Sequence, residues 1–237
     1  MYHRFEENKY PSTNIKIADF IEHLNLIKKK QFKFVKPTDF ENDLLNKEKE
    51  RKILLTIDDG FQSFYDQAWP VLKREKIPFI LFVNTREVGT KGYMDWNQIK
   101  EISKQKFVHI GNHSFSHEYL IDMKDQEIID DINMASSNFK SNLGQNSPFF
   151  SYPFGEYSSS FKNIVKDLGF KYAFGQHSGV VDKTKDFYEL PRFPINEAYG
   201  ELKRFETILK TIPLKVKSII PEEKYIQDTN NPPEVIV

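Results

Sequence analysis

Residues 53–60, Ile-Leu-Leu-Thr-Ile-Asp-Asp-Gly, place a run of apolar and β-branched residues directly before two carboxylates and a glycine. A short apolar run that ends in a turn is typical of a buried strand. The adjacent carboxylates of Asp58 and Asp59 repel each other and point in different directions, so one can bind a cation while the other moves protons. Taken alone, Asp-Asp-Gly after a strand is more often a plain turn.

On the C-terminal side of this segment, further apolar runs predict strands at 79–83, 107–110, 149–152 and 171–174. Amphipathic segments predict helices at 15–29, 126–143, 160–168 and 199–210. Strands that alternate with helices indicate an α/β protein with a parallel sheet, and several such units in 237 residues favour a (β/α) barrel. Barrel enzymes carry their chemistry on the loops that follow the strands.

Two local signals refine the predicted helices. Ser12 or Thr13 is expected to cap the N-terminus of the first helix, because both side chains accept hydrogen bonds from free backbone N–H groups. Pro70 lies inside the helical pattern that follows Ser63, so that helix is expected to begin late or to kink.

Composition excludes several classes of function. Lys plus Arg and Asp plus Glu both number 34, and this balance argues against a nucleic-acid-binding face or a polybasic membrane contact. The absence of cysteine excludes disulfides, thiolate metal sites and cysteine nucleophiles. No apolar stretch reaches the roughly 20 residues of a transmembrane helix, and the charged opening does not form a signal peptide. Oligomeric state is not predicted.

A second chemical signal follows the strand predicted at 107–110, where the chain continues Gly-Asn-His-Ser-Phe-Ser-His. We expect His113 and His117 on one side of a helical turn, within reach of one metal ion, although an isolated pair with this spacing is more often a surface feature. Because Asp59 also follows a strand, one barrel face would collect all three side chains. One carboxylate and two imidazoles leave a position for water, as in catalytic zinc sites.

A third segment, Ser-Tyr-Pro-Phe-Gly at 151–155, also follows a predicted strand. Pro153 and Gly155 are expected to form a rigid turn. The turn either packs in the core or lines a groove with the rings of Tyr152 and Phe154, and aromatic rings of this kind stack on the apolar faces of sugars.

These three segments, in this order, resemble those of the polysaccharide deacetylases of carbohydrate esterase family four, the NodB-homology domain, over about residues 1–209. The family's Thr-Phe-Asp-Asp-Gly corresponds to residues 56–60, and its His-Ser/Thr-x-x-His to residues 113–117. The resemblance implies a distorted barrel of about seven strands. It also implies Asp58 as the general base, and Asp59, His113 and His117 as ligands of a divalent metal. Zn²⁺ is our first expectation, although cobalt, nickel and iron accept the same ligands.

Members of this family remove acetyl groups from N-acetylglucosamine polymers, peptidoglycan, chitin, xylan or related glycans. The resemblance therefore implies a glycan substrate of the N-acetylglucosamine type. It implies that Tyr152, Pro153, Phe154 and Gly155 bind that substrate. It also favours the bacterial cell envelope or another extracytoplasmic location.

The sequence departs from the family pattern at the arginine that many members carry just ahead of the Tyr-Pro-x-Gly turn, paired with the base. Here Phe149, Phe150 and Ser151 occupy those positions. Arg192, after another strand-like segment, is the candidate to take the arginine's place beside Asp58, and a purely structural ion pair is the alternative.

A second departure concerns the general acid. Many members supply it from a histidine on a final strand, but no histidine follows His177 in this chain. The opening Tyr2-His3-Arg4 resembles the start of a circularly permuted branch that includes deacetylases of biofilm poly-N-acetylglucosamine. That resemblance implies His3 as the acid; a flexible terminal histidine is the alternative, and His177 is the rival. His23 and His109 are interpreted as structural.

We therefore predict a catalytic barrel over residues 1–212 that removes N-acetyl groups from glycans by metal-assisted amide hydrolysis. The tail, 213–237, is either the start of a second small β module or a segment that packs on the barrel. Two other functions remain open: an O-acetyl esterase or deformylase on the same fold, and a non-catalytic glycan-binding module.

Overall fold

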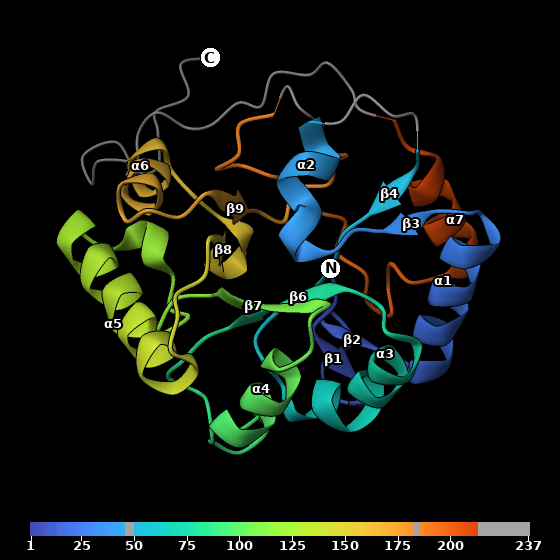
Figure 1. Ribbon diagram of the computed structural model, residues 1–237, viewed down its shortest axis with the longest axis horizontal. Helices are drawn as coiled ribbons and strands as arrows, with labels where there is room; N and C mark the ends of the chain where they lie inside the picture. Colours follow the sequence, from blue (N-terminus) through green and yellow to red (C-terminus); the bar gives the residue numbers. More distant parts are fainter. Residues whose placement is uncertain (46–49, 183–184, 213–237) are drawn as a thin grey trace, which may run out of the picture.

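The computed structural model describes residues 1–45, 50–182 and 185–212, so the tail predicted at 213–237 lies outside the described residues. Its helices and strands follow one another along the chain as Figure 1 labels them. They are β1 (Arg4–Phe5), β2 (Asn14–Ile15), α1 (Ile17–Lys29), β3 (Lys33–Phe34), α2 (Phe40–Leu45), β4 (Lys52–Ile53), β5 (Leu55–Ile57), α3 (Trp69–Glu75), β6 (Phe79–Val83), α4 (Trp96–Ser103), β7 (Val108–Asn112), α5 (Asp125–Leu143), β8 (Phe149–Ser151), α6 (Ser159–Asp167), β9 (Tyr172–Phe174) and α7 (Leu202–Lys210).

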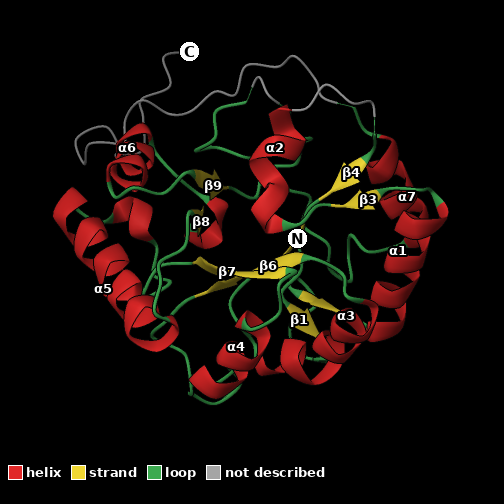
Figure 2. Cartoon of the chain, in the orientation of Figure 1, coloured by secondary structure: helices red, strands yellow, loops and turns green. Residues whose placement is uncertain are grey.

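A five-stranded parallel sheet in the order β5-β6-β7-β8-β9 forms the centre of the molecule. Helices surround it, with strands inside and helices outside (Figure 2). The predicted α/β class and the parallel sheet are confirmed. No described helix is both long and apolar enough to cross a membrane.

Two irregular segments close this sheet into a ring. One is the stretch around Leu190–Ile195, which pairs with β9, and the other is the N-terminal Met1–Tyr2, which joins that stretch to β5. The N-terminus accordingly lies inside the circle of helices (Figure 1). The closing backbone bonds are Leu190 N to Ala173 O (2.9 Å), Gly175 N to Leu190 O (2.9 Å), Met1 N to Phe193 O (3.0 Å), Ile195 N to Met1 O (3.0 Å), Tyr2 N to Thr56 O (3.0 Å) and Asp58 N to Tyr2 O (2.9 Å). The distorted barrel thus consists of five strands and two irregular segments, Met1–His3 and Leu190–Ile195, which we call its staves.

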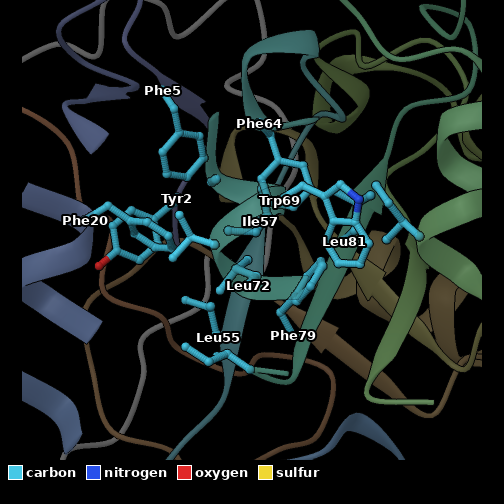
Figure 3. Packing of buried hydrophobic residues seen from close by; sticks show 14 of the residues in the cluster. Tyr2, Phe5, Phe20, Leu55, Ile57, Phe64, Trp69, Leu72, Phe79 and Leu81 are labelled. Atoms are coloured by element: carbon cyan, nitrogen blue, oxygen red, sulfur yellow. The ribbon is translucent and has the colours of Figure 1, made fainter. Parts of the chain in front are cut away.

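Alternation along the strands divides the buried side chains into an inner and an outer core. In β6, Ile80 and Phe82 belong to the cluster inside the ring, whereas Phe79 and Leu81 belong to the cluster between the sheet and the helices. Figure 3 shows part of the outer cluster, in which Phe79 packs against Trp69 and Tyr2 lies on the other side against Phe20. The same alternation in β5 turns Leu55 and Ile57 outward, so Thr56 and Asp58 face the inside.

In β7 the inward positions are His109, Gly111 and His113. A Cβ atom on Gly111 would lie 2.3 Å from Cδ1 of the Phe82 ring. The glycine therefore leaves room for this ring in the barrel interior, directly below His113.

Replacing Gly111 by alanine is expected to lower the free energy of unfolding by about 1–3 kcal/mol, because the added methyl group overpacks the interior. Urea denaturation of the purified protein measures this loss. In a Phe82→Leu background the smaller side chain leaves room for the added methyl group. Gly111→Ala should then lower the free energy of unfolding by less. An equal loss in both backgrounds would show that the Phe82 ring is not the cause.

Of the predictions for single helices and strands, some are confirmed and others are wrong. Helix α3 begins late, as Pro70 predicted, after a π-helical turn at Phe64–Ala68. The predicted strand at 53–57 is instead two strands: β4 pairs with β3 in a separate two-stranded sheet, and only β5 belongs to the barrel.

The predicted cap of the first helix is wrong. The N-cap of α1 is Lys16, whose side chain makes no capping bond, because Asn14 and Ile15 pair with β1 as a strand and separate Ser12 and Thr13 from the helix. Helices α2 and α4 were not predicted. For α4 a signal was present, since the side chain of Asp95 and that of Gln98 form a capping box at its start.

Candidate active site

Three predicted metal ligands meet at the carboxyl ends of β5 and β7. The Nε2 atoms of His113 and His117 each lie 3.3 Å from Oδ1 of Asp59. One ligand atom from each residue lies within 4.8 Å of the others. Asp59 and His113 are buried and His117 is partly exposed, so a bound ion would be open to solvent on one side.

The loop that carries the two histidines is not the helical turn that the sequence predicted. Ser114 and His117 have φ of 68° and 52°, in the left-handed region, and Asp59 across the site has φ of 74°. Left-handed backbone at non-glycine residues costs energy and persists where the surroundings determine it. The histidines converge because the loop folds back, and not because of helical spacing.

Side chains of the sheet and of α5 hold this loop in place. The Ser114 N–H donates to Oδ1 of Asn112 at 2.8 Å, and the His117 N–H donates to Oγ of Ser114 at 3.0 Å. Asp131 on α5 accepts hydrogen bonds from two successive backbone N–H groups, those of Phe115 (2.7 Å) and Ser116 (3.0 Å). The histidine pair is therefore positioned before any ligand binds.

The donor atoms of this triad fit a cation. Nδ1 of His113 lies 2.7 Å from the carbonyl oxygen of Ser151, so it carries the proton and Nε2 presents a lone pair. His113 Nε2 and Asp59 Oδ1 are buried and have no hydrogen-bond partner among the described residues. Burial lowers the pKa of His117, which favours its neutral form, whereas at His113 the carboxylates of Asp59 and Asp58 outweigh burial and raise the pKa. Converging lone pairs without donors are what a divalent metal satisfies.

Asp58 lies inside the ring beside the triad, fully buried, and forms a two-pronged ion pair with Arg192. Nη1 and Nη2 of the arginine each lie 2.8 Å from a different oxygen of the carboxylate. Ser151 adds a bond from its hydroxyl to Oδ2 at 3.1 Å and itself accepts from Arg192 Nη2 at 2.8 Å. Burial alone would raise the pKa of the Asp58 carboxyl, but the charge and hydrogen bonds of Arg192, together with the charges of His113 and His3, outweigh burial and hold this pKa below its usual range.

Arg192 is fixed by contacts on the other side of its guanidinium. Its Nε donates to the carbonyl oxygen of Gly175 at 2.8 Å, and the rings of Phe82 and Phe174 lie 5.6 and 5.8 Å from its central carbon. The structure thus places Arg192 where the sequence suggested that it replaces the missing family arginine.

His3 lies on the N-terminal stave at the level of the two aspartates, because Tyr2 pairs with Ile57 in parallel. It is buried, with 8% of its surface exposed. Burial lowers the pKa of its imidazole, while the negative charges of Asp59 and Asp58 act against this shift. A terminal residue packed in this way is not the flexible histidine of the alternative interpretation.

His177, the rival acid, is exposed on the loop after β9. Burial of part of its ring lowers its pKa, and the charged groups that act on it are Glu189, Lys185 and Arg192, not the site carboxylates. Its backbone oxygen accepts the N–H of Arg192 at 3.0 Å. As a candidate for the general acid, His3 therefore has a better position than His177, because the charges of both site aspartates act on it.

The turn after β8 presents one aromatic ring to the site, not two. Tyr152 is fully buried, and its hydroxyl donates to the carbonyl oxygen of Tyr188 at 2.8 Å, so its ring packs in the core, which was the first of the two alternatives for this turn. Phe154 is 47% exposed, and its ring centre lies 4.9 Å from that of His117 and 5.4 Å from that of Tyr119. Pro153 is buried in the same turn, and Gly155 has φ of 74°.

Two residues of the site, Ser151 and Tyr119, were not predicted from the sequence. Ser151, which bonds to both members of the Asp58–Arg192 pair, was noted only as a position where the family arginine is absent. Tyr119 is 41% exposed and follows the second histidine by two positions, but a single tyrosine in a loop carries no motif.

Comparison with known proteins supplies an independent line of evidence. Residues 45–173 match the sequence profile of the family described as "Polysaccharide deacetylase". A Bacillus subtilis (strain 168) protein named as a candidate polysaccharide deacetylase is 23% identical over 198 residues, which cover 83% of this chain and 70% of that protein. The poly-beta-1,6-N-acetyl-D-glucosamine N-deacetylase of Staphylococcus aureus (strain MSSA476) is 24% identical over 172 residues, 66% of this chain and 59% of that enzyme. The solved structure of IcaB from Ammonifex degensii superimposes with a TM-score of 0.80 at 25% identity, covering 89% of this chain and 95% of that one.

Proposed function

The chain belongs to the polysaccharide deacetylase family, and from this premise we propose that it is a metal-dependent hydrolase that removes N-acetyl groups from N-acetylglucosamine-containing glycans. The observation that supports metal dependence most directly is the convergence of lone pairs from Asp59, His113 and His117 at one point. A divalent cation held there, with Zn²⁺ as first candidate, would polarise the acetyl carbonyl and activate a water molecule.

Asp58 is assigned as the base that receives a proton from the attacking water. Its carboxylate is held by Arg192 and Ser151 beside the triad, and the ion pair keeps it charged at neutral pH. A positioned base contributes about 10²–10⁴-fold to such a reaction. The arginine and serine also prevent the carboxylate from rotating, which keeps an acceptor oxygen in a constant place.

His3 is assigned to protonate the departing nitrogen. Its segment borders β5, and the charges of both aspartates act on its imidazole, so His3 is a buried titratable group beside the site that can supply this proton. The products would be acetate and a free amino sugar.

Exposed aromatic side chains around the site support a glycan substrate. Phe154 and Tyr119 lie beside His117. On the side of the N-terminal stave, Tyr10 is 47% exposed and its ring lies 4.2 Å from the guanidinium carbon of Arg4. Exposed rings such as Phe154 and Tyr119 beside His117 can stack on sugar units that neighbour the one being deacetylated.

The test is acetate release from N-acetylglucosamine oligomers and from acetylated xylan, measured with added Zn²⁺ and after chelation. We expect release from the oligomers that chelation abolishes and Zn²⁺ restores. His117→Gln should lower the bound metal, measured by elemental analysis, whereas His109→Gln should not, because His109 lies inside β7 with its Nε2 on Ser147. A metal-loaded protein that releases no acetate, or release that chelation leaves unchanged, would contradict the proposal.

A further inference from the structure

Asn84 contains the third buried side-chain atom that lacks a hydrogen-bond partner among the described residues. The other two are Asp59 Oδ1 and His113 Nε2, which the metal site explains. Asn84 is 3% exposed, and its Oδ1 is the unpaired atom. Leaving a buried acceptor unpaired costs about 1–3 kcal/mol, so such an atom calls for a partner that the chain does not provide.

The sheet places this atom at the floor of the site. Asn84 directly follows β6, the strand between those that carry Asp59 and His113. The register of β6 with β7 pairs Val83 with Asn112, and the His113 N–H donates to the Val83 oxygen at 3.1 Å, so Asn84 comes next to His113.

The direction of the Asn84 side chain follows from the alternation of β6. Ile80 and Phe82 point into the ring, and Asn84 is the next position on that face. On its other flank β6 pairs with β5, which runs directly into Asp58 and Asp59. The amide therefore faces the same volume as the Asp58 carboxylate and the His113 imidazole.

The site groups toward which this placement directs Asn84 offer it no free donor. Asp58 and Asp59 are carboxylates that accept hydrogen bonds, and Nε2 of His113 presents a lone pair. The missing partner is therefore a donor brought by the ligand. An acetamido group carries an N–H donor next to its scissile bond, whereas an acetate ester has only oxygen there.

We propose that Asn84 Oδ1 accepts a hydrogen bond from the N–H of the substrate's acetamido group, and so makes the site selective for amides over esters. This inference rests on the proposed deacetylase function and names a specificity-determining residue of the same site. A site built to bond a substrate N–H discriminates against analogues that lack it, because its own polar group is then left unpaired.

The experiment compares kcat/KM for acetate release from a 2-acetamido sugar oligomer and from its 2-O-acetyl counterpart. In Asn84→Leu, which keeps the size of the side chain and removes the acceptor, kcat/KM for the amide should fall about 10- to 100-fold, because a lost hydrogen bond costs a buried site this much. That for the ester should change less than about threefold, so the amide-to-ester ratio falls at least several-fold. Bound zinc should stay constant.

Two further variants make the test decisive. Asn84→Asp has the same shape and keeps acceptor oxygens, so its amide-to-ester ratio should stay near that of the parent even if both rates fall. Thr85→Val alters the adjacent residue, whose hydroxyl accepts a hydrogen bond from Asn138 of α5, and should leave the ratio unchanged.

Several outcomes would overturn the inference. Equal losses on both substrates, no loss on either, or loss of zinc in Asn84→Leu would each show that Asn84 does not select the amide. If the parent protein releases acetate and only the ratio fails to change, this inference alone is wrong. If the parent releases acetate from neither substrate, the proposed function is wrong as well.

Discussion

The substitution Asp58→Asn is expected to lower the turnover number for acetate release by about 10²–10⁴-fold, because a positioned general base contributes this much to the rate. The amide has the shape of the carboxylate but cannot take up a proton from water near neutral pH. One oxygen remains to accept from Arg192, but the amide NH2 cannot accept the second guanidinium N–H, so the variant loses one of the two bonds of this pair. The measurement is the initial rate of acetate release at saturating substrate and metal.

Bound metal provides the control for Asp58→Asn. The ligand atoms that converge come from Asp59, His113 and His117, and not from Asp58. Elemental analysis should therefore find the same metal content in the variant as in the parent. A variant that keeps its metal and stays within tenfold of the parent rate would remove Asp58 from the role of base.

Replacing Arg192 by methionine is expected to lower the free energy of unfolding by about 3–5 kcal/mol at pH 7, because it leaves a buried carboxylate without its cation. Asp58 has no exposed surface, and the arginine provides two of its hydrogen bonds. Urea denaturation measures the loss. Arg204→Met is the matched control, since Arg204 is exposed against the ring of Tyr199 and should change stability by less than about 0.5 kcal/mol.

The effect of Arg192→Met should depend on pH in a defined direction. In the parent protein the pKa of Asp58 lies below its unfolded value of about 3.9, so the pair stabilises the fold above that pH and this contribution is lost as pH falls further. In the variant, burial acts without the cation and raises the pKa of Asp58 above the unfolded value. Acid then relieves the penalty by protonating the carboxyl. The stability difference between parent and variant should be smaller at pH 5 than at pH 7, and a constant difference would contradict this account.

Local patterns predicted the parts of this protein in which local sequence determines structure. The apolar run of β6 matched its prediction residue for residue, because a buried strand between two others needs apolar side chains on both faces. The sequence also predicted that Asp59, His113 and His117 would come together, since the loops that carry them follow strands and parallel strands end at the same rim. The helical turn assigned to His113–His117 was wrong because Asp131, from a helix beyond the loop, and the Asn112 side chain fix a left-handed path that spacing does not reveal.

What the sequence could not predict depends on contacts between distant residues. The pairing of Arg192 with Asp58 joins positions separated by 134 residues. The sequence therefore suggested this pairing only as one of two alternatives for Arg192. Tyr152 and Phe154 have similar aromatic character in sequence, and only the backbone of the turn determines which ring is buried. Asn84 matched no motif, and its unpaired oxygen becomes visible only when the strands are assembled.

The two irregular staves that close the barrel also bear on how the chain reaches its folded state. Met1 bonds to Phe193 across a separation of 192 positions, so the ring cannot close until nearly the whole barrel has been synthesised. Forming contacts of such long range costs a large loop-closure entropy before the contacts stabilise the fold, and this slows folding. Because His3 and Arg192 both lie on these staves, whereas the loops of Asp59, His113 and His117 follow strands that pair with nearer neighbours in sequence, the three candidate metal ligands can come together before the catalytic site is complete. Metal bound at that stage would stabilise the half-built barrel and favour its closure.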